Sequence, residues 1–273
     1  MKKISKTFIK KILPKRARTD SKIESGKVLI VAGGKGFYGA GLLSALAATR
    51  SGAGYTHLMS DLVQFPWLKF PDFIVHSFSL NELKKHSDHV VAIGPGLGTS
   101  KIKKRLLSYL IKNKIPKVIL DADALSLLAQ MKISSLPESW ILTPHEGELG
   151  RLLKLNPSEI KKNRQKSVLL AQKKYGCIVL LKGADTLIAT PGNLFLVNSG
   201  TRALAKAGSG DVLLGMIAAF YAQKQKADEA AILGCFIHGY ASELWLEKGR
   251  DYLSMRPTDL IDQLPETLHL LRK

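Results

Sequence analysis

Short apolar runs alternate with amphipathic stretches along the first two thirds of the chain, and this rhythm limits the folds open to it. The runs have the length of strands that are buried on both faces, as in a parallel sheet. They are residues 28–32, 90–93, 118–120, 141–142 and 178–181. The segments between them have helix length: 41–51, 100–112, 124–130, 146–153 and 158–175. This alternation predicts a three-layer α/β/α fold around a mostly parallel central sheet.

The pattern changes after residue 182. Apolar runs at 186–189 and 194–197 flank the turn Thr190-Pro191-Gly192-Asn193, which predicts a late antiparallel hairpin. Helices are expected at 209–223, at 227–248 and from 258 onward, with an interruption at Pro265. Since no repeat or shift in composition divides the chain, we expect one domain over residues 27–273, preceded by a basic arm at 1–26.

Positive charge is unusually high, with 41 basic against 22 acidic residues and a net charge of +19. Clustered Lys and Arg suit nucleic acid, so an RNA-binding module without chemistry is one alternative; it predicts salt-dependent affinity that is lost when residues 1–26 are deleted. Acidic small molecules, including phosphorylated ones, suit the same charge. Because much of the excess positive charge lies in residues 1–26, we expect a basic arm on an ordinary globular body and no nucleic-acid partner.

The arm itself allows two structures. A docked or frayed terminus is the simpler one. If the arm is helical, four apolar side chains share one face, as in a membrane-surface or partner-docking helix. These are Ile4, Phe8, Ile12 and Leu13.

Other features favour a cytoplasmic protein. No stretch reaches the ~18 apolar residues of a membrane-spanning helix, and the start of the chain lacks the apolar core of a secretory signal. Cys177 and Cys235 stand in apolar surroundings without metal-ligand spacing, which predicts buried free thiols and suits a reducing compartment.

The strongest functional signal opens the helix expected at 209. Gly208 and Gly210 leave the main chain accessible, so the amides around Ser209 can converge on phosphate oxygens at a helix N-terminus. Asp211 follows just inside the helix, where it could accept a proton from a substrate hydroxyl. A helix start with an acid in its first turn explains the same residues without chemistry.

Two more glycine-rich segments follow expected strands. Residues 94–98, Gly-Pro-Gly-Leu-Gly, fit either a binding loop or a tight turn. Residues 33–41 match the G-x-G-x-x-G dinucleotide spacing, and Asp61 lies near the place of a ribose-binding acid. The matching glycines are Gly34, Gly36 and Gly39. A dinucleotide-binding fold is not favoured, because it leaves the Gly208 turn and the late hairpin without a role.

Charged residues stand at three further strand ends. Asp121 and Asp123 could orient magnesium or a ligand hydroxyl, although an Asp can equally cap the next helix. His145 lies beside two carboxylates in the segment 143–148, and Lys182 opens the segment 182–186. In an open α/β sheet, ligands lie at the carboxyl ends of the strands. We therefore expect all these clusters along one edge of the sheet.

In this order, the segments resemble the ADP/ATP-dependent NAD(P)H-hydrate dehydratase family, a branch of the ribokinase-like superfamily. The resemblance runs from about Lys27 to the last helix and includes Asn198-Ser199-Gly200 on the way to Gly208. It implies a ribokinase-like fold and the nucleotide-dependent removal of water from hydrated NADH and NADPH (S epimer). Bacterial members generally use ADP and release AMP and phosphate, and eukaryotic members prefer ATP. Mg²⁺ is expected with the nucleotide.

The resemblance also implies roles for individual residues. Asp211 would deprotonate the hydroxyl of the hydrated ring, the amides of residues 208–211 would stabilise the moving phosphoryl group, and phosphate would then leave. The hydrated cofactor would contact Ala40, Gly96, Gly98, His145 and Asp211. The adenine nucleotide would contact Lys182, Gly183, Ala184, Asp185, Thr186, Gly208, Ser209 and Gly210. No residue is assigned to a resident metal ion.

Some features depart from the family pattern. Phe37-Tyr38 stands where Tyr-Pro is usual, and Ala205-Lys206-Ala207 replaces an approach richer in threonine and glycine. Many relatives carry an amino-terminal epimerase domain for which this chain has no room, so a separate epimerase is expected, together with assembly as a tetramer or larger homo-oligomer. The nearest alternative is a vitamin or sugar kinase of the same superfamily, which would use the Gly208–Asp211 turn equally well.

Overall fold

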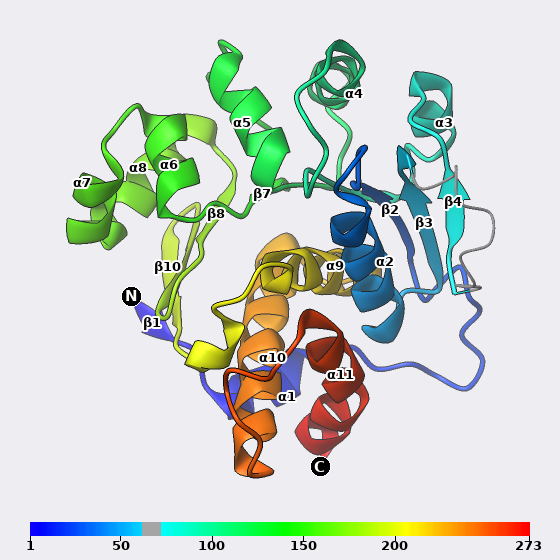
Figure 1. The fold of residues 1–273 in the computed structure, drawn as a ribbon, viewed down its shortest axis with the longest axis vertical. Coiled ribbons are helices and arrows are strands. Elements are labelled where there is room, and N and C mark those ends of the chain that lie inside the picture. Colours follow the sequence, from blue (N-terminus) through cyan, green and yellow to red (C-terminus); the bar gives the residue numbers. More distant parts are fainter. Residues whose placement is uncertain (62–71) are drawn as a thin grey trace.

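A computed structural model describes residues 1–61 and 72–273, and one twisted sheet forms its centre (Figure 1). Within these residues the strand order is β1-β10-β9-β8-β7-β6-β5-β2-β3-β4. The strands are β1 (Lys2–Lys3), β2 (Lys27–Val31), β3 (Tyr55–Met59), β4 (Ile74–His76), β5 (Val90–Ile93), β6 (Val118–Leu120), β7 (Ile141–Leu142), β8 (Ile178–Leu181), β9 (Thr186–Thr190) and β10 (Asn193–Val197).

The pairing confirms a mostly parallel sheet with a late antiparallel hairpin. In the part of the sheet from β8 to β4, every described pair of adjacent strands is parallel. β9 is antiparallel to both β8 and β10, so the hairpin reverses the chain direction beside the parallel strands. Each apolar run predicted from the sequence forms a strand.

Helices cover the two faces of the sheet. α2, α9, α10 and α11 lie together on one face, and α3 to α8 lie on the other (Figure 1). The helices are α1 (Lys6–Ile12), α2 (Tyr38–Arg50), α3 (Leu80–Lys85), α4 (Lys101–Lys112), α5 (Ala122–Gln130), α6 (Glu146–Leu153), α7 (Pro157–Lys162), α8 (Arg164–Tyr175), α9 (Ser209–Ala222), α10 (Ala227–Glu247) and α11 (Pro257–Arg272), with a 3₁₀ turn η2 (Arg202–Leu204). The predicted three-layer arrangement is therefore confirmed.

Successive side chains of β2 explain why its sequence is apolar at nearly every position. Val28 and Ile30 join the core beneath α9 and α10, whereas Leu29 and Val31 join the core on the opposite face. All four are fully buried. A strand that faces two helix layers buries both of its sides, so strict polar alternation is absent.

Two helix predictions were wrong. The segment 158–175 is not one helix, because Asn163 leaves helical geometry (φ −132°, ψ 48°) and separates α7 from α8. Pro265 does not interrupt the last helix, since α11 continues through it to Arg272. A proline inside a helix loses one backbone hydrogen bond. Burial of Leu260, Leu264 and Leu271 on one face of α11 offsets that cost.

The sequence interpretation missed β3, β4 and α3. β3 mixes polar and apolar residues (Tyr-Thr-His-Leu-Met), and β4 has three residues, so neither gives a continuous apolar run. α3 has only six residues, too few for a helical period to stand out. These elements form the edge of the sheet beyond β2.

The first residues are docked against the globular body. β1 pairs in parallel with β10, and α1 lies beside α10 and α11 (Figure 1). Ile4, Ile9 and Leu13 are buried, whereas Phe8 is 36% exposed, so the inward face differs from the one predicted. Arg272 donates to the carbonyl of Pro14 (2.8 Å) and joins the last helix to this segment. Among the described residues, no helix combines the length and hydrophobicity needed to cross a membrane.

Candidate active site

The loops that follow β2, β5, β7 and β8 meet at one edge of the sheet, as expected from the sequence. The Gly33 and Gly34 amides donate to the carbonyls of Pro95 (2.9 Å) and Gly96 (2.7 Å). The Lys182 amide donates to the carbonyl of Pro144 (2.9 Å). These backbone bonds hold segments that are far apart in sequence in one rigid rim.

Lys182 is the electrostatic centre of this rim. Its Nζ lies 2.6 Å from Asp121 Oδ1 and 3.7 Å from Glu148 Oε2, and both acids are buried. Burial alone would lower the pKa of Lys182, but the nearby carboxylates outweigh it and raise that pKa above its ordinary value. A Cβ built on Gly210 would lie 3.8 Å from the same Nζ, so a permanent cation stands beside the glycine-rich turn.

Asp211 lies in the first turn of α9, directly after the glycine-rich turn at residues 208–210. Gly208 caps the helix with φ +93°, a left-handed conformation that suits glycine. Burial, followed by the charge of Asp121, raises the pKa of Asp211 to about 6, although Lys182 opposes this shift. The Ser44 hydroxyl bonds the Asp211 carbonyl (3.0 Å) and the Ala40 carbonyl (2.9 Å). The first turns of α2 and α9 are therefore joined, which brings Ala40 and Asp211 to the same site.

His238 supports the turn from below and was missed in the sequence. Its Nε2 lies 3.0 Å from the carbonyl of Ser209 and 3.1 Å from the Ser209 hydroxyl. A carbonyl can only accept, so Nε2 carries the hydrogen. Burial lowers the pKa of His238 to about 4, which keeps the ring neutral. His238 comes from the middle of α10 and no local pattern marks it.

His145 is the N-cap of α6. Its Nδ1 accepts from the amides of Gly147 (3.0 Å) and Glu148 (3.3 Å), and the Glu148 carboxylate accepts from the His145 amide. Because Nδ1 is an acceptor, the neutral ring carries its hydrogen on Nε2. The side chain is 55% exposed. Its Nε2 lies 3.4 Å from Glu148 Oε1, so both ring nitrogens face the first turn of α6 while more than half of the side chain is exposed.

The loop at residues 94–98 closes the other side of the site. A Cβ built on Gly96 would lie 3.3 Å from the Cβ of Ala40, so these two predicted residues are adjacent. Nothing would lie within 4 Å of a Cβ on Gly98, whose amide donates to Asp123 (2.7 Å). Asp121 and Asp123 therefore have different partners and do not act as a carboxylate pair. Asp121 makes no side-chain cap bond either.

Arg164 orders the segment 182–186 and was also missed. One guanidinium nitrogen donates to the carbonyls of Lys182 (3.2 Å) and Asp185 (3.0 Å), and the other bonds Glu146. A Cβ on Gly183, which has φ +154°, would lie 2.7 Å from this guanidinium. Because the helical geometry breaks at Asn163, Arg164 is the first residue of α8. Within this segment, the Thr186 hydroxyl donates to the carbonyl of Gly183 (3.0 Å).

Asp61 has a local role. Its carboxylate accepts from the Lys35 amide (3.0 Å) and stabilises the loop at residues 33–39. That loop also bonds the 94–98 loop. The glycines with dinucleotide spacing thus belong to the rim of the site.

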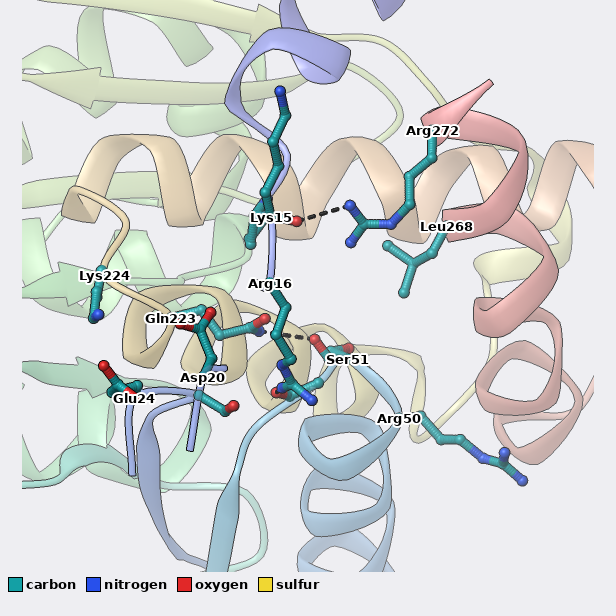
Figure 2. A pocket seen from close by; sticks show the side chains of 13 residues that line it. Lys15, Arg16, Asp20, Glu24, Arg50, Ser51, Gln223, Lys224, Leu268 and Arg272 are labelled. Carbon is teal, nitrogen blue, oxygen red and sulfur yellow. Dashed lines mark hydrogen bonds between the residues drawn. The ribbon is translucent and has the colours of Figure 1, made fainter. Parts of the chain in front are cut away.

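A cavity of about 520 Å³ lies at the other end of the sheet (Figure 2). Its lining includes Ser51 and Gln223, the residues at which α2 and α9 end. A helix of 14 residues spans about 21 Å, so this cavity is separated from Asp211 by the length of α9. Helix C-termini expose backbone carbonyls that have no partner within the helix. Just beyond the end of α2, Arg16 donates to the carbonyl of Gly52 (2.8 Å) (Figure 2).

Comparison with known proteins identifies the family of the chain. The family model of NAD(P)H-hydrate dehydratases matches residues 28–266. The chain belongs to the NAD(P)H-hydrate dehydratase family. The match covers the sheet from β2 to β10 together with α9 and α10, and so includes every segment of the rim.

Two relatives in this dehydratase family differ in length. An ADP-dependent (S)-NAD(P)H-hydrate dehydratase of Listeria monocytogenes is 31% identical over 99% of this chain and 97% of its own length. A bifunctional NAD(P)H-hydrate repair enzyme, Nnr, of Coxiella burnetii is 38% identical over 93% of this chain, but that match covers 52% of its own length. This chain thus spans about half the length of the bifunctional relatives that it matches.

Solved structures agree with the dehydratase fold. A ribokinase-like superfamily protein of Enterococcus faecalis superposes over 100% of this chain and 97% of its own, with a TM-score of 0.90 and 26% identity. The ADP/ATP-dependent NAD(P)H-hydrate dehydratase of Bacillus subtilis, co-crystallised with ATP and Mg²⁺, covers 98% of this chain and 97% of its own, with a TM-score of 0.86 and 28% identity. The fold is therefore ribokinase-like.

Proposed function

We propose that this chain removes water from hydrated NADH and NADPH (S epimer) at the expense of ADP or ATP, and so repairs damaged nicotinamide cofactors. The terminal phosphoryl group of the nucleotide passes to the ring hydroxyl, and the phosphate ester then eliminates. The products are NADH or NADPH, phosphate, and AMP or ADP. The observation that carries the proposal is the meeting of Lys182, the Gly208–Asp211 turn and the His145 cap at one rim of a family-matched fold.

Asp211 is proposed as the catalytic base. A carboxyl with a pKa of about 6 is mostly ionised at neutral pH, yet it holds a proton better than an exposed Asp does. General bases work best when their pKa lies near the working pH. Asp211 accepts the proton of the ring hydroxyl as that oxygen attacks the phosphoryl group. The amides of Gly208, Ser209 and Gly210 stabilise the charge on the phosphoryl oxygens.

The adenine nucleotide is proposed to lie between Lys182 and the segment 183–186. Arg164 fixes the carbonyls of this segment, so the exposed residues Gly183, Ala184 and Asp185 and the half-buried Thr186 are available to the nucleotide. The Lys182 ammonium attracts the phosphates. Carboxylate oxygens suit Mg²⁺, and Asp121 and Glu148 beside Lys182 fit an ion that arrives with the nucleotide. Held by these residues, the ion would supply positive charge to the phosphate oxygens.

The hydrated nicotinamide ring is proposed to lie on the opposite side of Asp211. Ala40 and Gly96 form its floor, Gly98 keeps that surface open, and the exposed part of the His145 ring is the proposed contact with the hydrate. Phe37 caps α2 at the edge of this surface and is 66% exposed. It stands where the family usually has tyrosine and offers a planar apolar contact to the ring.

One assay tests the proposal directly. Purified protein is mixed with hydrated NADH, Mg²⁺ and either ADP or ATP, and the returning absorbance of reduced nicotinamide is followed. Recovery that depends on one nucleotide supports the proposal and identifies the donor. Folded protein that shows no recovery with either nucleotide would refute it and favour a small-molecule kinase, which phosphate transfer to vitamin or sugar alcohols would detect.

The organisation around this activity is proposed on the same basis. Residues 27–273 would form the catalytic domain, with residues 1–26 as a basic arm docked on it. Assembly as a tetramer or larger homo-oligomer follows from the family resemblance, and light scattering tests it. Buried thiols at Cys177 and Cys235 agree with a cytoplasmic location.

A further inference from the structure

Four histidines gather at the β3–β4 edge of the sheet, away from the proposed chemistry. His57 lies on β3, His76 ends β4, His86 caps the C-terminus of α3, and His89 immediately precedes β5. Figure 1 shows α3 beside β3 and β4 at this edge. The chain has seven histidines, so more than half of them meet in one corner. Nothing in the dehydration reaction uses them.

The distances within the corner match the needs of a metal ion. One ring nitrogen from each of His57, His76 and His86 lies within 4.8 Å of the others, and His57 Nδ1 is 2.9 Å from His76 Nε2. Zinc–imidazole bonds are about 2.0–2.1 Å, which puts tetrahedral ligand nitrogens about 3.4 Å apart.

Neighbouring acceptors orient three of the rings for binding. His76 Nδ1 lies 3.2 Å from Glu82 Oε1, and His86 Nδ1 lies 2.9 Å from the Glu82 carbonyl. His89 Nδ1 lies 2.7 Å from Asp88 Oδ1. Each acceptor holds the hydrogen on Nδ1 and leaves Nε2 with a lone pair. Metal-binding histidines are typically held in this way by a carboxylate or a carbonyl.

His89 supplies a second, independent observation that points to a ligand. Its side chain is 8% exposed, and its Nε2 is a buried atom without a hydrogen-bond partner. Among the described residues, only the Ser51 hydroxyl shares that condition. The ring centroid of His89 lies 4.7 Å from that of His86 and 5.2 Å from that of His57. Buried polar atoms without partners are rare and call for an explanation.

We propose that His57, His76 and His86 bind one Zn²⁺ ion per chain, with the Nε2 of His89 or a water as the fourth ligand. Imidazole suits zinc and neighbouring transition metals, whereas Mg²⁺ prefers oxygen. The ion fastens β3, β4 and α3 together at the edge of the sheet.

The test uses the full chain without an affinity tag, because a polyhistidine tag would itself bind zinc. Chelator-treated protein is titrated with Zn²⁺ in the absence of nucleotide, and the metal retained after gel filtration is counted. We expect one equivalent, a rise in Tm that saturates at one equivalent, and the visible spectrum of tetrahedral Co²⁺ when cobalt replaces zinc. Mg²⁺ should cause none of these changes.

Three variants identify the ligands. His76→Gln should weaken zinc binding at least 100-fold, and Glu82→Gln, which alters only the orienting acceptor, should weaken it about 10- to 100-fold. His269→Gln, which removes an exposed histidine of α11, should change nothing. Wild-type protein that retains no zinc, or equal binding by wild type and Glu82→Gln, would overturn the proposal. Because no nucleotide or hydrate is present, the result is independent of the proposed dehydratase activity.

Discussion

Replacing Asp211 with Asn should change stability and activity in opposite directions. The pKa of Asp211 rises from its ordinary value of 3.8 to about 6 in the folded protein. At about 1.4 kcal/mol per pKa unit, ionised Asp211 costs the fold up to about 3 kcal/mol, and solvent screening reduces this value because the side chain is only partly buried. The carboxyl stabilises the fold fully below pH 3.8, and this contribution is lost as pH rises to about 6. The Asn variant avoids that loss.

Urea unfolding of both proteins at pH 4 and pH 8 measures the effect. We expect nearly equal unfolding free energies at pH 4 and a variant that is more stable by about 1–3 kcal/mol at pH 8. Turnover should fall by about 10²–10⁴-fold, as loss of a general base predicts. In the wild type, kcat/KM should fall about tenfold per pH unit below about pH 6, and this limb should be absent from the variant's residual activity. A variant that is no more stable than wild type at pH 8, or a fully active one, would refute the reasoning.

The other predictions concern the walls of the site. His145→Ala should weaken binding of the hydrated cofactor more than binding of the nucleotide, and it should lower the unfolding free energy by about 1 kcal/mol through the lost cap. His145→Asn should restore the stability but not the binding. Equal losses of affinity for both ligands would remove His145 from the hydrate side. Gly183→Ala should lower the unfolding free energy by about 1–3 kcal/mol, because φ is +154° and the Cβ meets Arg164; Gly192→Ala, with φ +82° and open space, is the matched control and should cost less. Arg164→Ala should raise the KM for nucleotide with a smaller change in kcat, whereas Arg151→Ala on the exposed side of α6 should not; unchanged nucleotide KM in the Arg164 variant would contradict the role of its carbonyl contacts.

Features of the fold that repeat along the chain could be predicted from the sequence. The parallel strands β2 and β5 to β8 were found because burial on both faces leaves no polar position to interrupt the apolar runs, as at β2. Asp211 was found because helix N-termini with glycines have a recognisable local sequence. β3 and the short α3 were missed because one face of β3 carries polar groups and six residues cannot reveal a helical period.

Contacts between distant segments were not predictable in this way. Arg164 can bond the Lys182 carbonyl because the chain leaves helical geometry at Asn163, although the sequence pattern there predicts a continuous helix. His238 on α10 contacts Ser209 at the start of α9, which is 29 residues away in the sequence. The histidines at the β3–β4 edge have no metal-binding spacing and meet only when the sheet forms. The sequence contains the residue types, while the strand order decides which of them become neighbours.

The docked first residues also affect how the protein is made. Lys2 pairs with Phe195, and α1 rests on α10 and α11, so this segment is synthesised long before the parts that bury it. Contacts this far apart in sequence form slowly, and apolar side chains wait exposed during that time. These side chains are Ile4, Ile9 and Leu13. Five lysines stand among the first thirteen residues, and such charges oppose the association of unfinished chains. Until α10 and α11 have formed, these lysines therefore stand beside apolar side chains that have nothing to pack against.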